Sequence, residues 1–432
     1  MNCENLIQFL SFSPTAWHAV DTVKNTLTEN GYTELKESEK WQIEPCGKYF
    51  VRRNDSSLIA FEIPEKGFAP FMAAAAHTDS PSFRIKPHPE MKGSGAVRIN
   101  TEGYGGMLCH PWFDRPLSCA GRIMVKTENG FESRLFKSEQ DLFMIPSLAI
   151  HMNRGVNENT SLNKQKDLMP LFAMESKEEI RLIDVIAKEA GIKSEAIIDS
   201  DLLLYVREEP RIWGAKKEFI SGPHLDDLYC AWGLTNGMLA ASNANAIKVL
   251  ALFDNEEVGS LTKQGAYSTF FYDTLKRISI SMGKDEEDFL MALAESFLVS
   301  ADNAHAVHPN YPEKIDPTNQ PKINGGIVIK FNGNQKYTSD AFSASVMRSV
   351  CEKAGVPVQE FVNRSDMAGG STLGNLSNVQ VSLNAVDIGL AQLAMHSCYE
   401  TAGVQDGEYL VNAMKCYYAS AIRKNGNRIE LL

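Results

Sequence analysis

Short apolar runs that end abruptly in acidic residues and histidines recur along this chain of 432 residues. Residues 71–76 are apolar and lead directly into His77, and the apolar residues 247–253 lead into the acidic stretch 254–257. A short apolar run bounded by polar residues is typical of a buried strand. In open α/β sheets, ligands bind outside the carboxyl ends of the strands. The pattern therefore predicts an α/β sheet with its chemistry along one edge.

The second half of the chain repeats this arrangement. Residues 297–299 precede Asp302, and residues 361–362 precede a polar segment. We interpret residues 379–383 as a further strand, which precedes a segment ending in His396. Residues 227–242 have helical periodicity. After Gly222 the chain thus alternates helices and strands.

A different pattern occupies the middle of the chain. Residues 121–136 alternate apolar and polar side chains around Asn129-Gly130, which is a strong hairpin signal. The length of the chain favours two domains over one core. We predict a discontinuous catalytic domain, residues 1–90 and 219–432, interrupted by a β-rich domain, residues 91–218.

Composition excludes several function classes. Acidic residues outnumber basic ones by 54 to 43, and no Lys/Arg-dense run of the kind that binds nucleic acid is present. The eight cysteines lack C-x-x-C spacing and are interpreted as reduced thiols. No leader-like start and no uncharged stretch long enough to cross a membrane is apparent. A cytoplasmic enzyme that binds neither nucleic acid nor membranes is expected.

The candidate chemistry is metal-assisted hydrolysis, which requires imidazole and carboxylate ligands and a separate base. Taken singly, each candidate has an ordinary alternative: an acidic pair can begin a helix or form a solvated turn, and His396 can be a buried histidine on an apolar helix. Their joint placement after apolar runs favours a metal site. The candidates are His77, Asp79, Asp226, Asp227, Glu256, Glu257, Asp302, His305, His308 and His396.

Five segments together resemble the aspartyl aminopeptidase (M18) family, and the likeness extends over nearly the whole chain. They are residues 76–81 (AHTDSP), 225–228 (LDDL), 254–260 (DNEEVGS), 300–311 (SADNAHAVHPNY) and 393–397 (LAMHS). The resemblance implies a mixed-sheet α/β metallopeptidase domain with helices on both faces, plus an inserted, mostly β dimerisation domain. It also implies an aminopeptidase that removes single N-terminal residues from peptides with a water activated by two metals.

The resemblance further implies two divalent metal ions per subunit. His77, Asp226 and Asp302 would hold one ion, and Asp226, Glu257 and His396 the other, so that Asp226 bridges them. Ligation by imidazole and oxygen without thiolate suits Zn²⁺ and would tolerate Co²⁺ or Mn²⁺.

The sequence alone does not decide between Glu256 and Glu257, but the family pattern makes Glu256 the general base. Asp79 would orient the His77 ring, with a turn-forming aspartate as its alternative.

The family also suggests which residues meet the substrate. His305 would contact it, and Lys330 and Tyr337 would line a pocket for an acidic side chain. N-terminal Asp or Glu is therefore the expected preference, with a neutral preference as the alternative. His151 would reach the active site of a neighbouring subunit in a homo-oligomer, a dodecamer built from dimers.

Two other functions compete with this interpretation. A two-metal phosphoesterase uses similar ligands, but its site usually adds Arg or Lys near the phosphate, whereas the motifs here are net acidic. A non-catalytic assembly protein would not need Glu256 beside a complete ligand set. The glycine-rich residues 369–374 lack the lysine of a phosphate-binding loop.

Overall fold

The computed structural model describes residues 3–158 and 161–432, and it divides the chain into two compact units. The first comprises residues 1–79, 211–395 and 400–432, and the second residues 80–210 and 396–399. The sequence pattern placed the two divisions later, at 90/91 and 218/219. The first division lies earlier because strand β5 (Ser82–Gly93) pairs entirely within the sheet of the second unit.

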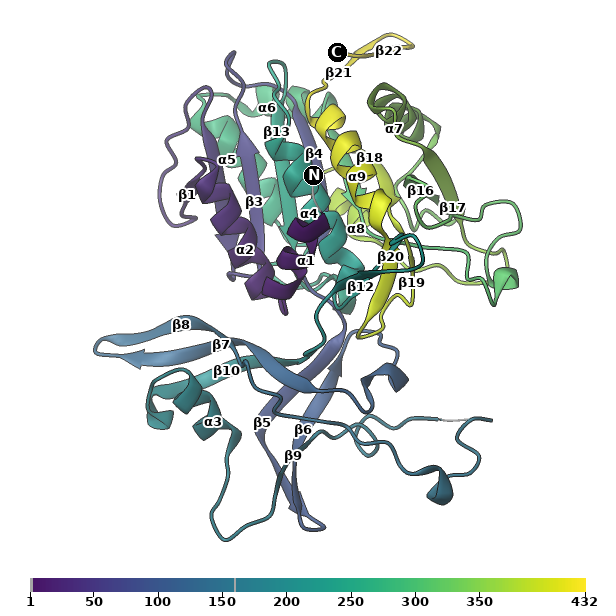
Figure 1. Ribbon diagram of the computed structural model, residues 1–432. Helices are drawn as coiled ribbons and strands as arrows, with labels where there is room; N and C mark the ends of the chain where they lie inside the picture. The colour runs from purple at the N-terminus through teal and green to yellow at the C-terminus, as the bar shows by residue number, and fades with distance from the viewer. Residues whose placement is uncertain (1–2, 159–160) are drawn as a thin grey trace. The chain divides into compact units, whose positions relative to one another are not determined.

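A mixed sheet forms the centre of the first unit (Figure 1). Within the described residues it has nine strands, in the order β1 (Thr33–Leu35), β2 (Lys48–Arg53), β3 (Ser57–Glu62), β13 (Ile247–Phe253), β4 (Phe71–His77), β14 (Phe297–Ala301), β18 (Asn384–Gly389), β16 (Ile327–Phe331) and β17 (Val358–Val362).

The four middle strands β13, β4, β14 and β18 are parallel to one another. Their registers bring the carboxyl ends level, because Phe253 is opposite His77 and Ala301 is opposite Ile388. The predicted α/β sheet is therefore confirmed, and polar segments follow several strands at one edge of it.

The predicted strand at residues 379–383 is wrong. These residues cover the end of helix α8 (Leu373–Gln380) and the turn before β18. Leu373 and Ser377 are buried one helical turn apart. A short apolar run does not distinguish a strand from the end of a buried helix.

Helices cover both faces of this sheet, which explains its continuous apolar runs. Along β4, Met72, Ala74 and Ala76 face one core, while Phe71 and the alternate alanines face the other. Helices α1 (Cys3–Phe12), α2 (Ala16–Glu29), α4 (Leu225–Leu239), α7 (Ala341–Ala354) and α9 (Val404–Tyr418) pack on the first face (Figure 1). Helices α5 (Phe270–Ser281), α6 (Glu286–Ala294) and α8 pack on the second face.

Two smaller sheets complete the first unit. One has the strand order β11 (Arg211–Trp213), β12 (Phe219–Gly222), β20 (Glu400–Gly403), β19 (Ala391–Leu393) and β15 (Ala304–His305). It joins segments that follow β14 and β18, so it supports the edge where polar residues gather. The other is the hairpin of β21 (Ile422–Asn425) and β22 (Arg428–Leu431).

The second unit is built on an antiparallel sheet. Its strand order is β8 (Gly130–Lys137), β7 (Leu117–Thr127), β10 (Ile197–Val206), β5, β6 (Ala96–Tyr104) and β9 (Leu171–Met174). The predicted hairpin is confirmed, since β7 and β8 pair up to Thr127 and Gly130. Helix α3 (Leu182–Glu189) packs on the apolar core of this sheet, where Phe83 and Trp112 make an edge-to-face contact.

None of the helices in the described part of the chain combines the length and apolar character needed to cross a membrane.

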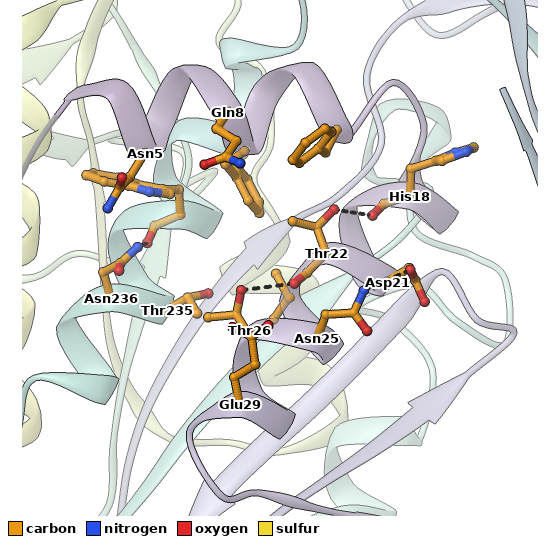
Figure 2. Close-up of a pocket in the computed structure, with 14 residues that line it drawn as sticks. Asn5, Gln8, His18, Asp21, Thr22, Asn25, Thr26, Glu29, Thr235 and Asn236 are labelled. Atoms are coloured by element: carbon orange, nitrogen blue, oxygen red, sulfur yellow. Dashed lines mark hydrogen bonds between the residues drawn. The ribbon is translucent and has the colours of Figure 1, made fainter. Parts of the chain in front are cut away.

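Helices α1, α2 and α4 line a pocket of about 570 Å³ with both polar and apolar side chains (Figure 2). The hydroxyl of Thr22 donates to the carbonyl of His18 (2.9 Å), and that of Thr26 donates to the carbonyl of Thr22 (3.0 Å). These hydroxyls therefore complete the hydrogen bonding of their own helix. None of the predicted site residues is among the described residues that line this pocket.

Candidate metal centre

Three predicted ligands converge where the parallel strands end. His77 is the last residue of β4, Asp302 follows β14, and Asp226 lies at the start of α4. A ligand atom from each lies within 4.8 Å of the other two, and all three side chains are buried. His77 Nε2 is 3.7 Å from Asp226 Oδ1. One imidazole and two carboxylates at this spacing form a donor set that suits Zn²⁺.

Glu256 and Glu257 form a second group with His77, again with ligand atoms within 4.8 Å of one another. Both belong to the 3₁₀ turn η4 (Glu256–Val258), which follows β13. Asn255 begins this turn in the left-handed conformation, at φ 62°, which asparagine tolerates better than most residues. The turn redirects the chain from the end of β13, so that both glutamates approach His77.

Asp79 links the two groups. Its carboxylate oxygens accept hydrogen bonds from the backbone N–H groups of Glu256 and Glu257, each at 3.1 Å. His77 Nδ1 donates to the carbonyl oxygen of Asp79 at 2.9 Å. A carbonyl only accepts, so this bond fixes the tautomer in which Nε2 carries the lone pair for a metal. Asp79 thus orients both the His77 ring and the Glu256 turn.

The centre concentrates negative charge in a buried space. Burial raises the pKa of Asp302, and Lys330 partly opposes this rise. Burial also raises the pKa of Glu256 to about 7; His77 opposes the rise, whereas Asp302, Asp79 and Asp226 add to it. Carboxylates this close disfavour each other's ionised form, and a bound cation would relieve that repulsion.

Burial affects the imidazole of His77 in the opposite direction from the carboxylates. Burial alone would lower the pKa of His77, but its interactions with Asp226 and Asp79 raise it well above the ordinary value. The side chains present therefore fit a divalent cation by donor type, spacing and charge.

Lys330 and Tyr337, predicted to bind substrate, are buried behind Asp302. Lys330 Nζ donates to the backbone carbonyl of Asn303 at 2.9 Å and lies 3.3 Å from Asp302 Oδ1. The same ammonium lies 5.5 Å from the centre of the Tyr337 ring. Lys330 therefore neutralises part of the charge on Asp302.

His305 lies at a pocket of about 340 Å³ on the first unit. Its ring meets that of Phe361 edge to face, with the ring centres 5.8 Å apart. Lys314 and Arg364 also line this pocket, and no Asp or Glu is among its described lining residues. Arg364 is already ion-paired with Asp366 at 2.8 Å, so its charge is balanced within the protein.

His396 lies in the segment that clusters with the second unit. It occupies a turn at φ 65°, so the alternative of a core histidine on an apolar helix is wrong. Its Nδ1 donates to the carbonyl of Gly106 at 2.5 Å, which presents Nε2 as the atom with a lone pair. Its role as a ligand stays a prediction.

His151, also in the second unit, is exposed in the 3₁₀ turn η2 (Ile150–Met152).

Sequence reasoning missed a group of buried polar residues beside the ligands. Asn303, Gln392 and Glu400 are each at most 2% exposed and are connected by hydrogen bonds. Only Asn303 carries a sequence signal, as the neighbour of Asp302. Gln392 and Glu400 belong to strands β19 and β20, which no sequence motif predicts.

Comparison with known proteins agrees with this geometry. A family described as "Aminopeptidase I zinc metalloprotease (M18)" matches residues 9–418. The chain belongs to the M18 family of aminopeptidases. It is similar to a "Probable M18 family aminopeptidase 2" from Clostridium novyi, with 47% identity over 424 residues that cover 96% of this chain and 97% of that protein. A protein of the same description from Stutzerimonas stutzeri is 41% identical, with 97% and 98% covered.

Solved structures share the fold of this M18 aminopeptidase. The structure described as the "Ape4 and Nbr1 complex" superposes with a TM-score of 0.94 at 36% identity, covering 96% of this chain and 85% of that one. A yeast mApe1 dodecamer superposes at 0.84 with 25% identity, covering 96% of each chain. The predicted fold class and the prediction of a zinc aminopeptidase are confirmed, so neither a phosphoesterase nor a non-catalytic protein is supported.

Proposed function

We propose that this M18 aminopeptidase uses two divalent ions per subunit to remove single residues from peptide N-termini. His77, Asp226 and Asp302 hold one ion, and the bridging Asp226, Glu257 and His396 hold the other. The convergence of three buried ligands from β4, β14 and α4 carries this proposal. The second ligand set rests on the family resemblance and on the ring orientation of His396.

The residues of the chain then have separate roles in the reaction. Bound divalent ions supply Lewis acidity to the scissile carbonyl and the attacking water. Glu256 takes the proton from that water and passes it to the leaving amine. Burial, with neighbouring carboxylates, raises the pKa of Glu256 to about 7 without a cation. Bound cations would lower this pKa and favour the ionised form that accepts a proton. Asp79 keeps Glu256 in place by accepting the N–H groups of its turn.

The test of this assignment is Glu256→Gln. We expect the variant to keep the fold and its metal content while turnover of an aminoacyl anilide falls about 10²–10⁴-fold. Metal analysis and kinetics on the same sample measure both. Glu295→Gln, the same substitution at an exposed position, is the matched control. Near-normal turnover in Glu256→Gln would remove Glu256 as the base.

A second variant tests whether the Asp226 carboxylate bridges the two ions. Asp226→Ala should lose both ions and should not recover in excess Zn²⁺, since one carboxylate serves the two sites. Two ions per chain in this variant would contradict the bridging role.

We further propose a preference for N-terminal Asp or Glu. The pocket beside His305 supports it, because Lys314 lines the pocket and no Asp or Glu is among its described lining residues. In this proposal Lys330 and Tyr337, which are buried next to Asp302, also contribute to binding the acidic side chain of the substrate. A preference for neutral residues is the alternative, and rates on a panel of aminoacyl substrates distinguish the two.

Assembly into a dodecamer built from dimers through the β-rich second unit is also part of the proposed function. In it, His151 reaches the active site of a neighbouring subunit. The side chains next to His151 support a buried interface, since Leu148, Ile150 and Met152 are 58%, 46% and 71% exposed in the single chain. Clustered exposed apolar side chains are typical of interaction surfaces. The solved mApe1 relative is described as a dodecamer.

A further inference from the structure

Glu400, Gln392 and Asn303 form a buried triad of polar side chains in the first unit. They are 2%, 1% and 2% exposed. Glu400 begins β20, Gln392 lies on the neighbouring β19, and Asn303 follows Asp302. Buried polar groups are costly unless they are hydrogen-bonded, so the partners of this triad indicate what it is for.

One end of the triad holds the backbone of Asp226. The N–H of Asp226 donates to Glu400 Oε2 at 2.9 Å. Asp226 and Asp227 have non-helical backbone angles, φ −86°, ψ 106° and φ −120°, ψ 22°. The regular hydrogen bonding of α4 therefore does not fix the peptide that carries the Asp226 carboxylate. Glu400 supplies that restraint from a different strand.

The other end of the triad lies beside Asp302. Gln392 Nε2 donates to Glu400 Oε1 at 3.1 Å, and Asn303 Nδ2 donates to Gln392 Oε1 at 2.7 Å. Asn303 Nδ2 also donates to the carbonyl of Leu225 at 2.8 Å. The triad thus runs from Asp226 to the residue after Asp302 and returns to the residue before Asp226.

The charge of Glu400 sets the direction of every bond in the triad. A carboxylate only accepts hydrogen bonds, so the amide of Gln392 must turn its nitrogen toward Glu400 and its oxygen toward Asn303. The amide of Asn303 must then turn its nitrogen toward Gln392 and Leu225. Its oxygen is left to accept from the backbone N–H of Leu390 at 3.4 Å and the Cys230 thiol at 3.3 Å. A neutral group at position 400 would remove this constraint.

We propose that Glu400 is a positioning residue for the metal centre, which acts through Gln392 and Asn303 to hold Asp226 and Asp302 at the spacing that one ion requires. The proposal rests on the proposed function, in which Asp226 and Asp302 share an ion. Groups that orient metal ligands in this way typically change metal affinity about 10–100-fold when they are altered.

The test uses Co²⁺ binding to metal-free protein, followed by the visible absorption of the bound ion and by competition with a chelator. Glu400→Gln keeps the shape of the side chain but leaves one of two N–H donors without an acceptor. We expect Co²⁺ affinity to fall about 10–100-fold and the absorption bands to change, because the ligand geometry is altered.

The swap variant E400Q/Q392E is the sharper test. Gln at position 400 can accept from the N–H of Asp226 and donate to a Glu at position 392, which still accepts from Asn303. Every bond of the triad is then satisfied again with the same total charge. We expect Co²⁺ affinity and absorption to return to within a few-fold of wild type.

Glu62→Gln is the matched control, because it makes the same substitution in a partly buried carboxylate that also has a fixed partner. Glu62 pairs with Lys248, near the start of β13, whereas the ligands lie at the opposite end of that strand. It should lower the thermal stability without changing Co²⁺ affinity.

Three results would overturn the proposal: wild-type Co²⁺ affinity in Glu400→Gln, a folded swap variant that binds as weakly as Glu400→Gln, or an equal loss in Glu62→Gln. If Glu400→Gln does not fold, Gln392→Met breaks the triad while leaving the bond between Glu400 and Asp226. Unchanged affinity in that variant would also reject the proposal. Asp226→Ala distinguishes a failure of this proposal from a failure of the proposed function. Undiminished Co²⁺ binding in that variant would reject Asp226 as a ligand.

Discussion

Lys330 is a buried cation that balances the charge of Asp302. It is 3% exposed, its ammonium lies 3.3 Å from Asp302, and it faces the ring of Tyr337. Such a buried cation is held by its carboxylate partner, and the strongly raised pKa of Lys330 keeps it charged: burial opposes the rise, and Asp302 is the main cause of it. The same charge would attract an acidic substrate side chain.

We predict that Lys330→Met reduces kcat/KM for N-terminal Glu and Asp about 10-fold or more, and that neutral substrates suffer less. A hydrogen bond to a charged group contributes about 1.5–3 kcal/mol, which corresponds to that range. Rates on Glu, Asp, Leu and Met anilides measure it, with the exposed Lys322→Met as control. An equal loss on all substrates would mean that Lys330 serves only Asp302, and faster cleavage of Leu or Met than of Glu by wild type would reject the acidic preference.

At the level of single residues, the sequence predicts candidate metal ligands better than it predicts the residues that hold those ligands in position. His77, Asp226 and Asp302 lie within recognisable segments, so their convergence could be expected. Glu400 and Gln392 could not be identified, because their function depends on the pairing of β19 with β20. That pairing joins short strands that have no pattern of their own.

Helix α4 depends on a lysine from the sheet to complete its carboxyl end. Lys248 of β13 is 2% exposed, and its Nζ donates to the carbonyls of Met238 and Ala241 at 3.1 and 2.5 Å. It also pairs with Glu62 at 2.7 Å. The last carbonyls of a helix lack partners within the helix. The carbonyl of Met238 accepts from the N–H of Ala241, just beyond the helix, at 3.2 Å, and the buried lysine adds a second, charged donor.

We predict that Lys248→Met lowers the free energy of unfolding by about 3–5 kcal/mol, the usual cost of removing one partner of a buried ion pair. Thermal and urea unfolding of the metal-free protein measure the loss. Lys66→Met, at an exposed lysine, should change stability far less. Equal unfolding curves for the two variants would contradict the capping role of Lys248.

At the level of elements, the central strands were predictable and their neighbours were not. Continuous apolar runs predict β4, β13 and β14, which are buried on both faces of the sheet. The run at residues 379–383 misled because it joins an exposed residue of α8, Val379, to two buried residues that follow the helix, Val381 and Leu383. The first domain division was also displaced, since β5 continues from β4 after only a short turn. Local pattern shows where a strand lies, but not which sheet it joins.

At the scale of the whole molecule, activity should depend on assembly. We predict that His151→Ala keeps its two metals and its oligomeric size while turnover falls about 10²–10³-fold, the usual cost of losing one preorganised donor. Mixing it with Glu256→Gln and allowing the subunits to exchange should restore part of the activity, since some interfaces then combine an intact Glu256 with an intact His151. Absence of recovery despite verified exchange, or a fully active monomer, would contradict a shared site.

The order of strands in the central sheet also affects how the protein is made. Strand β4 lies between β13 and β14, and both are translated only after residues 80–210 of the β-rich second unit. A growing chain therefore carries β4, apolar along nearly its full length, without either neighbour while residues 78–246 are translated. Unpaired apolar strands are prone to aggregation. We therefore expect chaperones that bind the incomplete chain to bind at residues 71–77. The same delay keeps an incomplete chain from assembling a hydrolytic centre, so a ribosome that stops early releases no active peptidase.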